Sequence, residues 1–104
     1  MEFINLTAHD INIITEDKIV VIEPSGSIAR VDVTMEDVGV LDGIPVKRNT
    51  YGSITGLPEP KEGRYYIVSV LVAQVAKRDD VLVTNDAVRD DKGRIIGCRS
   101  LARI

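Results

Sequence analysis

The sequence predicts one mostly β domain of the α+β class: a mixed, largely antiparallel sheet or partly closed barrel with one short helix. Isoleucine, valine and leucine recur in almost every segment, and β-branched residues favour strands over helices. Short apolar stretches are separated by turn residues, and only residues 69–77 suit a helix. The chain has 104 residues, which is close to the commonest length of one domain. We therefore expect a single globular domain over residues 1–104.

The first quarter of the chain predicts a strand followed by a hairpin. Residues 3–6 form one apolar run and residues 10–15 form a second. The polar residues 16–18 then lead into Ile19–Ile22, so the second and third runs are expected to pair. Pro-Ser-Gly at residues 24–26 predicts a further turn, because proline presets φ and glycine accepts a positive φ.

The middle third contains the most regular strand pattern. Residues 29–34 alternate between apolar and polar side chains, which predicts a strand with one face on the core and the other in water. The dipeptide Asp42-Gly43 favours a tight reversal. Pro45 has no N–H to donate to a ladder, so a strand over residues 46–49 is expected to begin there or to lie at an edge.

The last third predicts a strand, the helix and a final hairpin. Residues 65–68 read as a buried strand, and residues 69–77 are apolar nearly all round, so the helix is expected to be largely buried. Ser69 is suited to cap the N-terminus of this helix. A strand over residues 81–84 follows, and the order strand, helix, strand would form a crossover. A hairpin is expected around residues 91–93.

Cysteine content and hydropathy favour the cytoplasm. Cys98 is the only cysteine, so no intrachain disulfide can form, whereas small secreted domains usually rely on several. The longest apolar run, residues 65–73, is too short to span a bilayer. The N-terminus lacks the basic segment of a secretory signal. We expect a cytoplasmic protein without a membrane partner, and a buried, reduced thiol at Cys98.

Charge is distributed unevenly along the chain. The net charge is −3, which argues against nucleic acid as a partner. Residues 88–104 carry five basic residues and two aspartates, a net of +3, so the remainder of the chain carries −6. An acidic body with a cationic C-terminal segment suits a small anionic partner. The alternative is a solvated hairpin whose arginines face water or pair with the acidic body.

The sequence contains no catalytic or metal-binding signature. His9 is the only histidine, and beside Asp10 it could act as a general base or metal ligand. Neighbouring side chains on an extended chain point in opposite directions, however, and no second histidine completes a zinc site. A turn in which Asp10 accepts a backbone hydrogen bond is the structural alternative. Phosphate-binding glycine loops and Gly-x-Ser-x-Gly are absent, so we expect no catalytic residue, no metal and no cofactor.

Four residues are candidates for binding an anionic ligand. Ser69 could present its hydroxyl together with the free N–H groups of the first helical turn, or act as a cap only. Arg78 and Arg89 each begin an Arg-Asp-Asp step near a strand end, and guanidinium groups suit phosphates. The alternatives for these steps are paired carboxylates that hold Mg²⁺, or solvated charge. Arg99 lies further along the same cationic segment.

The chain resembles a family of small, largely uncharacterised prokaryotic and phage proteins. Residues 3–10, Phe-Ile-Asn-Leu-Thr-Ala-His-Asp, are similar to the family's opening Asn-Leu-Thr-Pro-His, with Ala8 in place of the proline. Tyr-Ile-Val-Ser at residues 66–69, Arg-Asp-Asp at residues 78–80 and the hairpin over residues 89–93 are also similar. The resemblance runs over most of the chain. It implies a stand-alone globular domain and a viral or mobile-element setting, and it implies no established activity or ligand.

These observations favour a non-catalytic binding module for a small anionic ligand, phosphate-like or nucleotide-like, with Tyr65 or Tyr66 stacking on a base. The alternative is an interaction or assembly protein that associates through exposed strand edges. In either case we expect a homo-oligomer, because pairing hides the edges of small β domains. An enzyme that uses His9 and nearby carboxylates is the third hypothesis.

Overall fold

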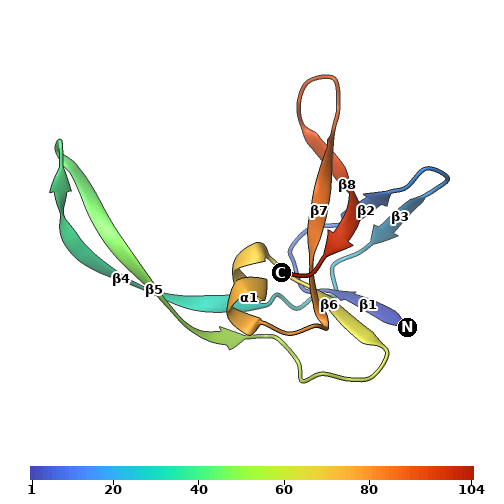
Figure 1. The fold of residues 1–104 in the computed structure, drawn as a ribbon, viewed down its shortest axis with the longest axis horizontal. Helices are drawn as coiled ribbons and strands as arrows, with labels where there is room; N and C mark the ends of the chain where they lie inside the picture. The colour runs from blue at the N-terminus through green and yellow to red at the C-terminus, as the bar shows by residue number, and fades with distance from the viewer.

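A computed structural model describes all 104 residues and shows a mostly β protein with one short helix (Figure 1). Six strands form one mixed sheet in the order β1-β6-β7-β8-β2-β3, and the other two form a separate hairpin. The elements are β1 (Glu2–Asn5), β2 (Ile11–Ile14), β3 (Ile19–Ile22), β4 (Arg30–Leu41), β5 (Ile44–Thr55), β6 (Arg64–Ile67), α1 (Val70–Ala76), β7 (Val81–Arg89) and β8 (Ile95–Ala102). The predicted fold class is confirmed.

The sheet combines parallel and antiparallel pairing. β6 and β7 lie parallel to each other and are joined through α1, so the predicted crossover is formed. β1 is parallel to β6, and β2 is parallel to β8 where Ile13 lies opposite Cys98. The β2–β3 and β7–β8 hairpins are antiparallel, and with β4–β5 they contain most of the paired residues. The end of β1 also meets the segment that follows β3, where Asn5 forms an isolated parallel bridge to Pro24.

The sheet has a packed cluster on each face. The larger cluster includes Tyr66 and Val81 from the sheet and Val72 from α1, all almost completely buried. Adjacent residues of a strand point to opposite faces, so Ile67 lies on the other side, where it packs with Cys98 and neighbouring side chains. Each fully buried aliphatic side chain contributes about 1.5–3 kcal/mol to folding, so these two clusters hold the sheet and the helix together.

Both ends of α1 are capped, and the cap at Ser69 is the one that the sequence predicts. Ser69 has an extended backbone, and its hydroxyl accepts a hydrogen bond from the Val72 N–H at 3.4 Å. Lys77 adopts a left-handed conformation with φ 52°, and its N–H donates to the Ala73 carbonyl. Val72 and Ala73 are buried, whereas Val70 faces solvent, so the helix is covered on one side only. No helix in the structure is long and apolar enough to cross a membrane.

β4 and β5 form a long hairpin, here called the arm, which departs from the sequence prediction. Ala29 is buried and Val31 is half-buried, but every β4 residue after Val31 is exposed. The arm passes beside α1 and then extends away from the sheet (Figure 1). Its reversal at Asp42 and Gly43 was predicted correctly, and both residues have positive φ, 50° and 77°. The predicted half-buried strand is therefore wrong beyond Val31, because no other part of the chain covers β4 after that residue.

Candidate functional site

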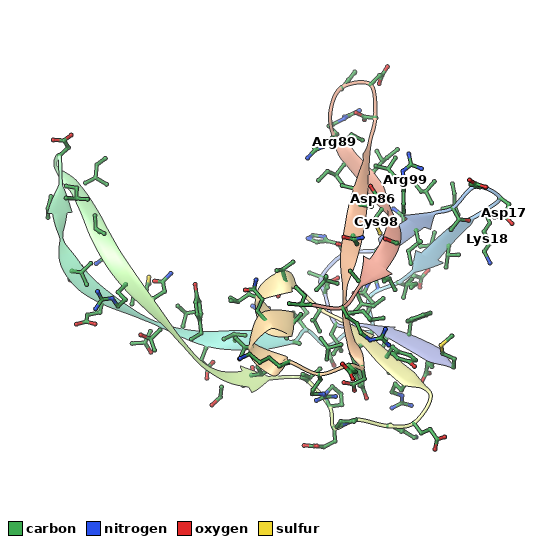
Figure 2. All side chains as sticks on the ribbon, in the orientation of Figure 1. Asp17, Lys18, Asp86, Arg89, Cys98 and Arg99 are labelled. Atoms are coloured by element: carbon green, nitrogen blue, oxygen red, sulfur yellow. The ribbon has the colours of Figure 1, made fainter.

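The four predicted ligand residues lie in different parts of the molecule. Ser69 and Arg78 flank α1, whereas Arg89 ends β7 and Arg99 lies in β8 (Figure 2). β7 has nine residues, so at about 3.3 Å per residue its two ends lie about 26 Å apart. Arg78 precedes the first residue of β7, and Arg89 is the last. A small ligand could not contact Arg78 and Arg89 of one chain together.

Arg78 is held by groups of its own chain. Its Nε and Nη2 donate to the Asp80 carboxylate at 2.9 and 2.6 Å, and its Nη1 donates to the Pro58 carbonyl at 3.1 Å. The guanidinium lies 5.9 Å from the centre of the Tyr66 ring. These hydrogen bonds raise the pKa of Arg78 and lower that of Asp80. Because its charge is balanced, Arg78 is better suited to fix the loop before β6 than to bind an anion.

The Ser69 hydroxyl also has a hydrogen-bond partner within its own helix. Its hydroxyl already accepts the hydrogen bond from Val72, and α1 has only seven residues. The geometry gives Ser69 the role of a helix cap.

Arg89 and Arg99 are the predicted residues that keep an unbalanced charge. Arg89 donates to the Gly93 carbonyl at 2.7 Å and has no carboxylate partner. Arg99 is exposed and forms no ion pair. By contrast, Arg94 pairs with Asp90 at 3.0 Å, and the pKa of Asp90 is lowered, first by the backbone N–H of Arg94. Of the four predicted ligand residues, Arg99 is thus the one whose side chain has no partner within the chain.

A hollow of about 380 Å³ lies between the start of β2 and the β7–β8 hairpin. Its lining contains the carboxylates of Asp10 and Asp86 and no basic residue. Asp86 and Cys98 mark its place in the hairpin (Figure 2). Like charges repel, so this hollow does not suit the anionic ligand predicted from the sequence.

Asn5 is a buried polar residue that was not among the predicted sites. It is 1% exposed, and its Nδ2 donates to the carbonyls of His9 and Ile22 at 2.7 and 3.0 Å. Its Oδ1 accepts from the backbone N–H and the hydroxyl of Thr7 at 2.9 and 2.6 Å. Asn5, rather than Asp10, therefore organises the turn between β1 and β2. The signal in the sequence was Asn-x-Thr directly after an apolar run, a pattern typical of local side-chain bonding to the backbone.

His9 itself lies on the surface. Its side chain is exposed, and only its backbone carbonyl takes part in hydrogen bonds. No three His, Cys, Asp or Glu side chains come together as a group that could hold a metal ion.

The arm and β3 both expose apolar side chains, and neither was predicted as a site. On the arm, seven large side chains are between 44% and 69% exposed: Val33, Met35, Val38, Val40, Leu41, Ile44 and Tyr51. On β3, Ile19 and Val21 are 65% and 52% exposed. The tip of the arm and the β2–β3 hairpin lie at opposite ends of the longest axis of the molecule (Figure 1).

The charges of the arm are largely balanced within it. Lys47 forms an ion pair with Asp37 across the two strands, and Glu36 lies opposite Arg48. The arm therefore presents apolar side chains beside paired charges, rather than a surface of one sign.

Comparison of the chain with protein-family models, with curated proteins and with solved structures finds no match. The resemblance to the Asn-Leu-Thr-Pro-His family stays a prediction, and function has to be argued from the geometry.

Proposed function

We propose that this protein is an assembly protein, a subunit that binds a second copy of itself through the arm. The observation that carries the proposal is a hairpin of two 12-residue strands without a single buried residue. An isolated two-stranded hairpin is marginally stable in water at best. A partner that covers the apolar side chains would stabilise the extended arm.

The amount of exposed apolar surface supports an oligomer interface. The exposed fractions of the seven apolar residues of the arm add up to about four whole side chains. Their complete burial would contribute a free energy of roughly 6–12 kcal/mol. Association costs about 4–15 kcal/mol in lost translational and rotational freedom. One buried arm would roughly balance this cost. A symmetric contact to which each subunit contributes an arm doubles the apolar gain and exceeds it.

A second copy is the partner that the charge pattern favours. Because Lys47 and Asp37 neutralise each other, the arm lacks the single-sign field that would attract a strongly charged partner. Closed symmetric assemblies of identical chains are also the commonest oligomers of soluble proteins.

The variant Leu41→Lys tests this proposal. Leu41 lies beside the turn of the arm and is 69% exposed, so lysine is tolerated in the free subunit but opposes burial in an interface. We expect sedimentation of the wild type to give a multiple of 11.4 kDa at low micromolar concentration. Leu41→Lys should lower the mass to that of a smaller species or weaken association at least about tenfold.

The matched control is Ile104→Lys, which changes the charge equally at a residue that is 64% exposed and lies outside the arm. It should leave the mass unchanged. A wild type that sediments as a monomer at high micromolar concentration would overturn the proposal, and so would equal effects of the two variants. A variant-sensitive complex with a different protein, but no self-association, would overturn it in favour of another partner.

A second proposed function is the binding of a small anionic ligand, phosphate-like or nucleotide-like, and the unpaired Arg99 supports it. A charged hydrogen bond contributes about 1.5–3 kcal/mol, and added salt weakens it at an exposed site. We expect one or more members of a panel of mono-, di- and cyclic nucleotides to raise the melting temperature. Arg99→Ala should abolish the rise, and Arg48→Ala, which removes an exposed arginine of the arm, should retain it. A panel that moves no melting curve at millimolar concentration would contradict this function.

A further inference from the structure

β3 is an edge strand that lacks the usual protection against pairing. The edges of the six-stranded sheet are β1 and β3. Edge strands normally carry charges, prolines or bulges that prevent association. β1 carries Glu2 in an ion pair with Arg64, and the arm has Pro45 and two irregularities in its ladder. β3 reads Ile-Val-Val-Ile and contains none of these features.

The hairpin ladder determines which backbone groups of β3 are free. The Thr15 N–H donates to the Lys18 carbonyl at 2.9 Å, so these two residues form a bonded pair. Bonded and non-bonded pairs alternate along an antiparallel ladder, so every second residue from Lys18 onward bonds to β2. The N–H and C=O groups of Ile19 and Val21 therefore point to the open edge. The side chains of the same two residues are the exposed ones on this strand.

We propose that β3 pairs with β3 of a second copy, antiparallel about a two-fold axis at Val20, so that two sheets join into one. Ile19 then lies opposite Val21 of the partner subunit, and this pair occurs twice. Each pair exchanges two backbone hydrogen bonds through the groups that are free in the single chain. The four exposed apolar side chains gather on one face of the joined sheet.

The Asn5–Pro24 bridge selects this register. Two residues that lie opposite each other in antiparallel strands have their side chains on the same face of the sheet. The two-fold axis must therefore lie at a residue that pairs with its own copy, and this residue is either Val20 or Val21. An axis at Val21 would place Lys18 of the partner subunit against Pro24, whose edge Asn5 already occupies. An axis at Val20 confines the contact to the five residues that start at Lys18.

The β3 pairing rests on the proposed function in one respect only, which is that the partner is a second copy of this chain. The turn of the β2–β3 hairpin, marked by Asp17 and Lys18 in Figure 2, lies far from the arm along an axis of 51 Å. One subunit can therefore make both contacts, and each can be tested without the other.

Disulfide trapping tests the register directly. In a Cys98→Ala background, Val20→Cys places two thiols in a non-bonded pair, where Cα atoms lie about 4.5 Å apart, within disulfide range. Val21→Cys is the matched control, because its Cα atoms would lie about 7–8 Å apart on the diagonal. We expect mild oxidation at low micromolar concentration to convert the Val20→Cys protein to covalent dimer at least tenfold faster than the Val21→Cys protein.

Further variants separate this contact from the arm contact. Ile19→Lys in the Val20→Cys background should slow trapping at least tenfold and leave the circular dichroism spectrum unchanged, because Ile19 contacts solvent in the free subunit. Leu41→Lys in the same background should leave trapping through β3 unchanged, so failure of the arm contact does not remove the signal. Equal trapping rates for the two cysteine positions, or faster trapping at Val21, would overturn the β3 pairing. Absence of trapping at Val20 in the folded protein would overturn it as well.

Discussion

Replacement of Asn5 by alanine should be one of the most destabilising single changes in this protein. The side chain is 1% exposed and makes four hydrogen bonds, two donated to carbonyls and two accepted from Thr7. Each bond contributes about 0.5–1.5 kcal/mol net, so the loss of all four should lower the free energy of unfolding by about 2–6 kcal/mol. For a domain of this size, that corresponds to a fall in melting temperature of roughly 10–30 °C.

The assay is urea unfolding followed by circular dichroism at several protein concentrations, because an oligomer couples stability to concentration. Asn12→Ala is the matched control, since Asn12 makes a single long bond of 3.4 Å to the Ile96 carbonyl. We expect this control to lose less than about 1 kcal/mol. If Asn5→Ala cost no more than Asn12→Ala, the view that Asn5 joins β1, the turn and the end of β3 would be refuted.

Three further predictions concern packing, acid stability and the thiol. Gly97→Ala should lower the free energy of unfolding by about 1–3 kcal/mol, because the new Cβ would lie 2.7 Å from the Asn12 carbonyl oxygen. Urea unfolding measures this loss, and an unchanged midpoint of the unfolding transition would contradict it. The hydrogen bonds from Arg78 lower the pKa of Asp80 in the folded protein. The ionised carboxylate therefore stabilises the fold above its unfolded pKa of about 3.9, and this stability is lost as the pH falls through the lower pKa of the folded state. Asp80→Asn should therefore be less stable at pH 7 and lose less stability than wild type between pH 4 and 2, and equal losses would refute it. Cys98 is 5% exposed, so a thiol reagent should label it slowly in the native protein and rapidly in urea; rapid native labelling would show that the thiol is open.

Local chemistry in the sequence predicted most of the individual elements. Serine before an apolar run and a turn at Asp42-Gly43 depend on only a few neighbouring residues, and the structure has both the Ser69 cap and the reversal. The hairpin around residues 91–93 is also formed, with Gly93 at φ 80°. These features were predictable because the backbone preferences that decide them act within one turn.

The candidate site was less predictable, because it depends on partners far along the chain. Arg78 and Arg89 share the Arg-Asp-Asp pattern, yet Arg78 folds back onto Asp80 and Pro58, whereas Arg89 only closes its own hairpin. The contact with Pro58 bridges 20 residues of sequence. Charge counts alone could not distinguish a balanced arginine from a free one.

The arm shows where a strand pattern stops being informative. An alternation with a period of two residues shows which side chains share a face of the strand, but it does not show what covers that face. In β4, Val31 packs against the core under α1, while Val33 and Met35 continue the same alternation into solvent. An arm that functioned only in water would gain nothing from apolar residues at these positions, and their exposure favours aggregation. The continued alternation is therefore better explained by a second protein surface that completes the burial outside the single chain, and the Leu41→Lys experiment examines that surface directly.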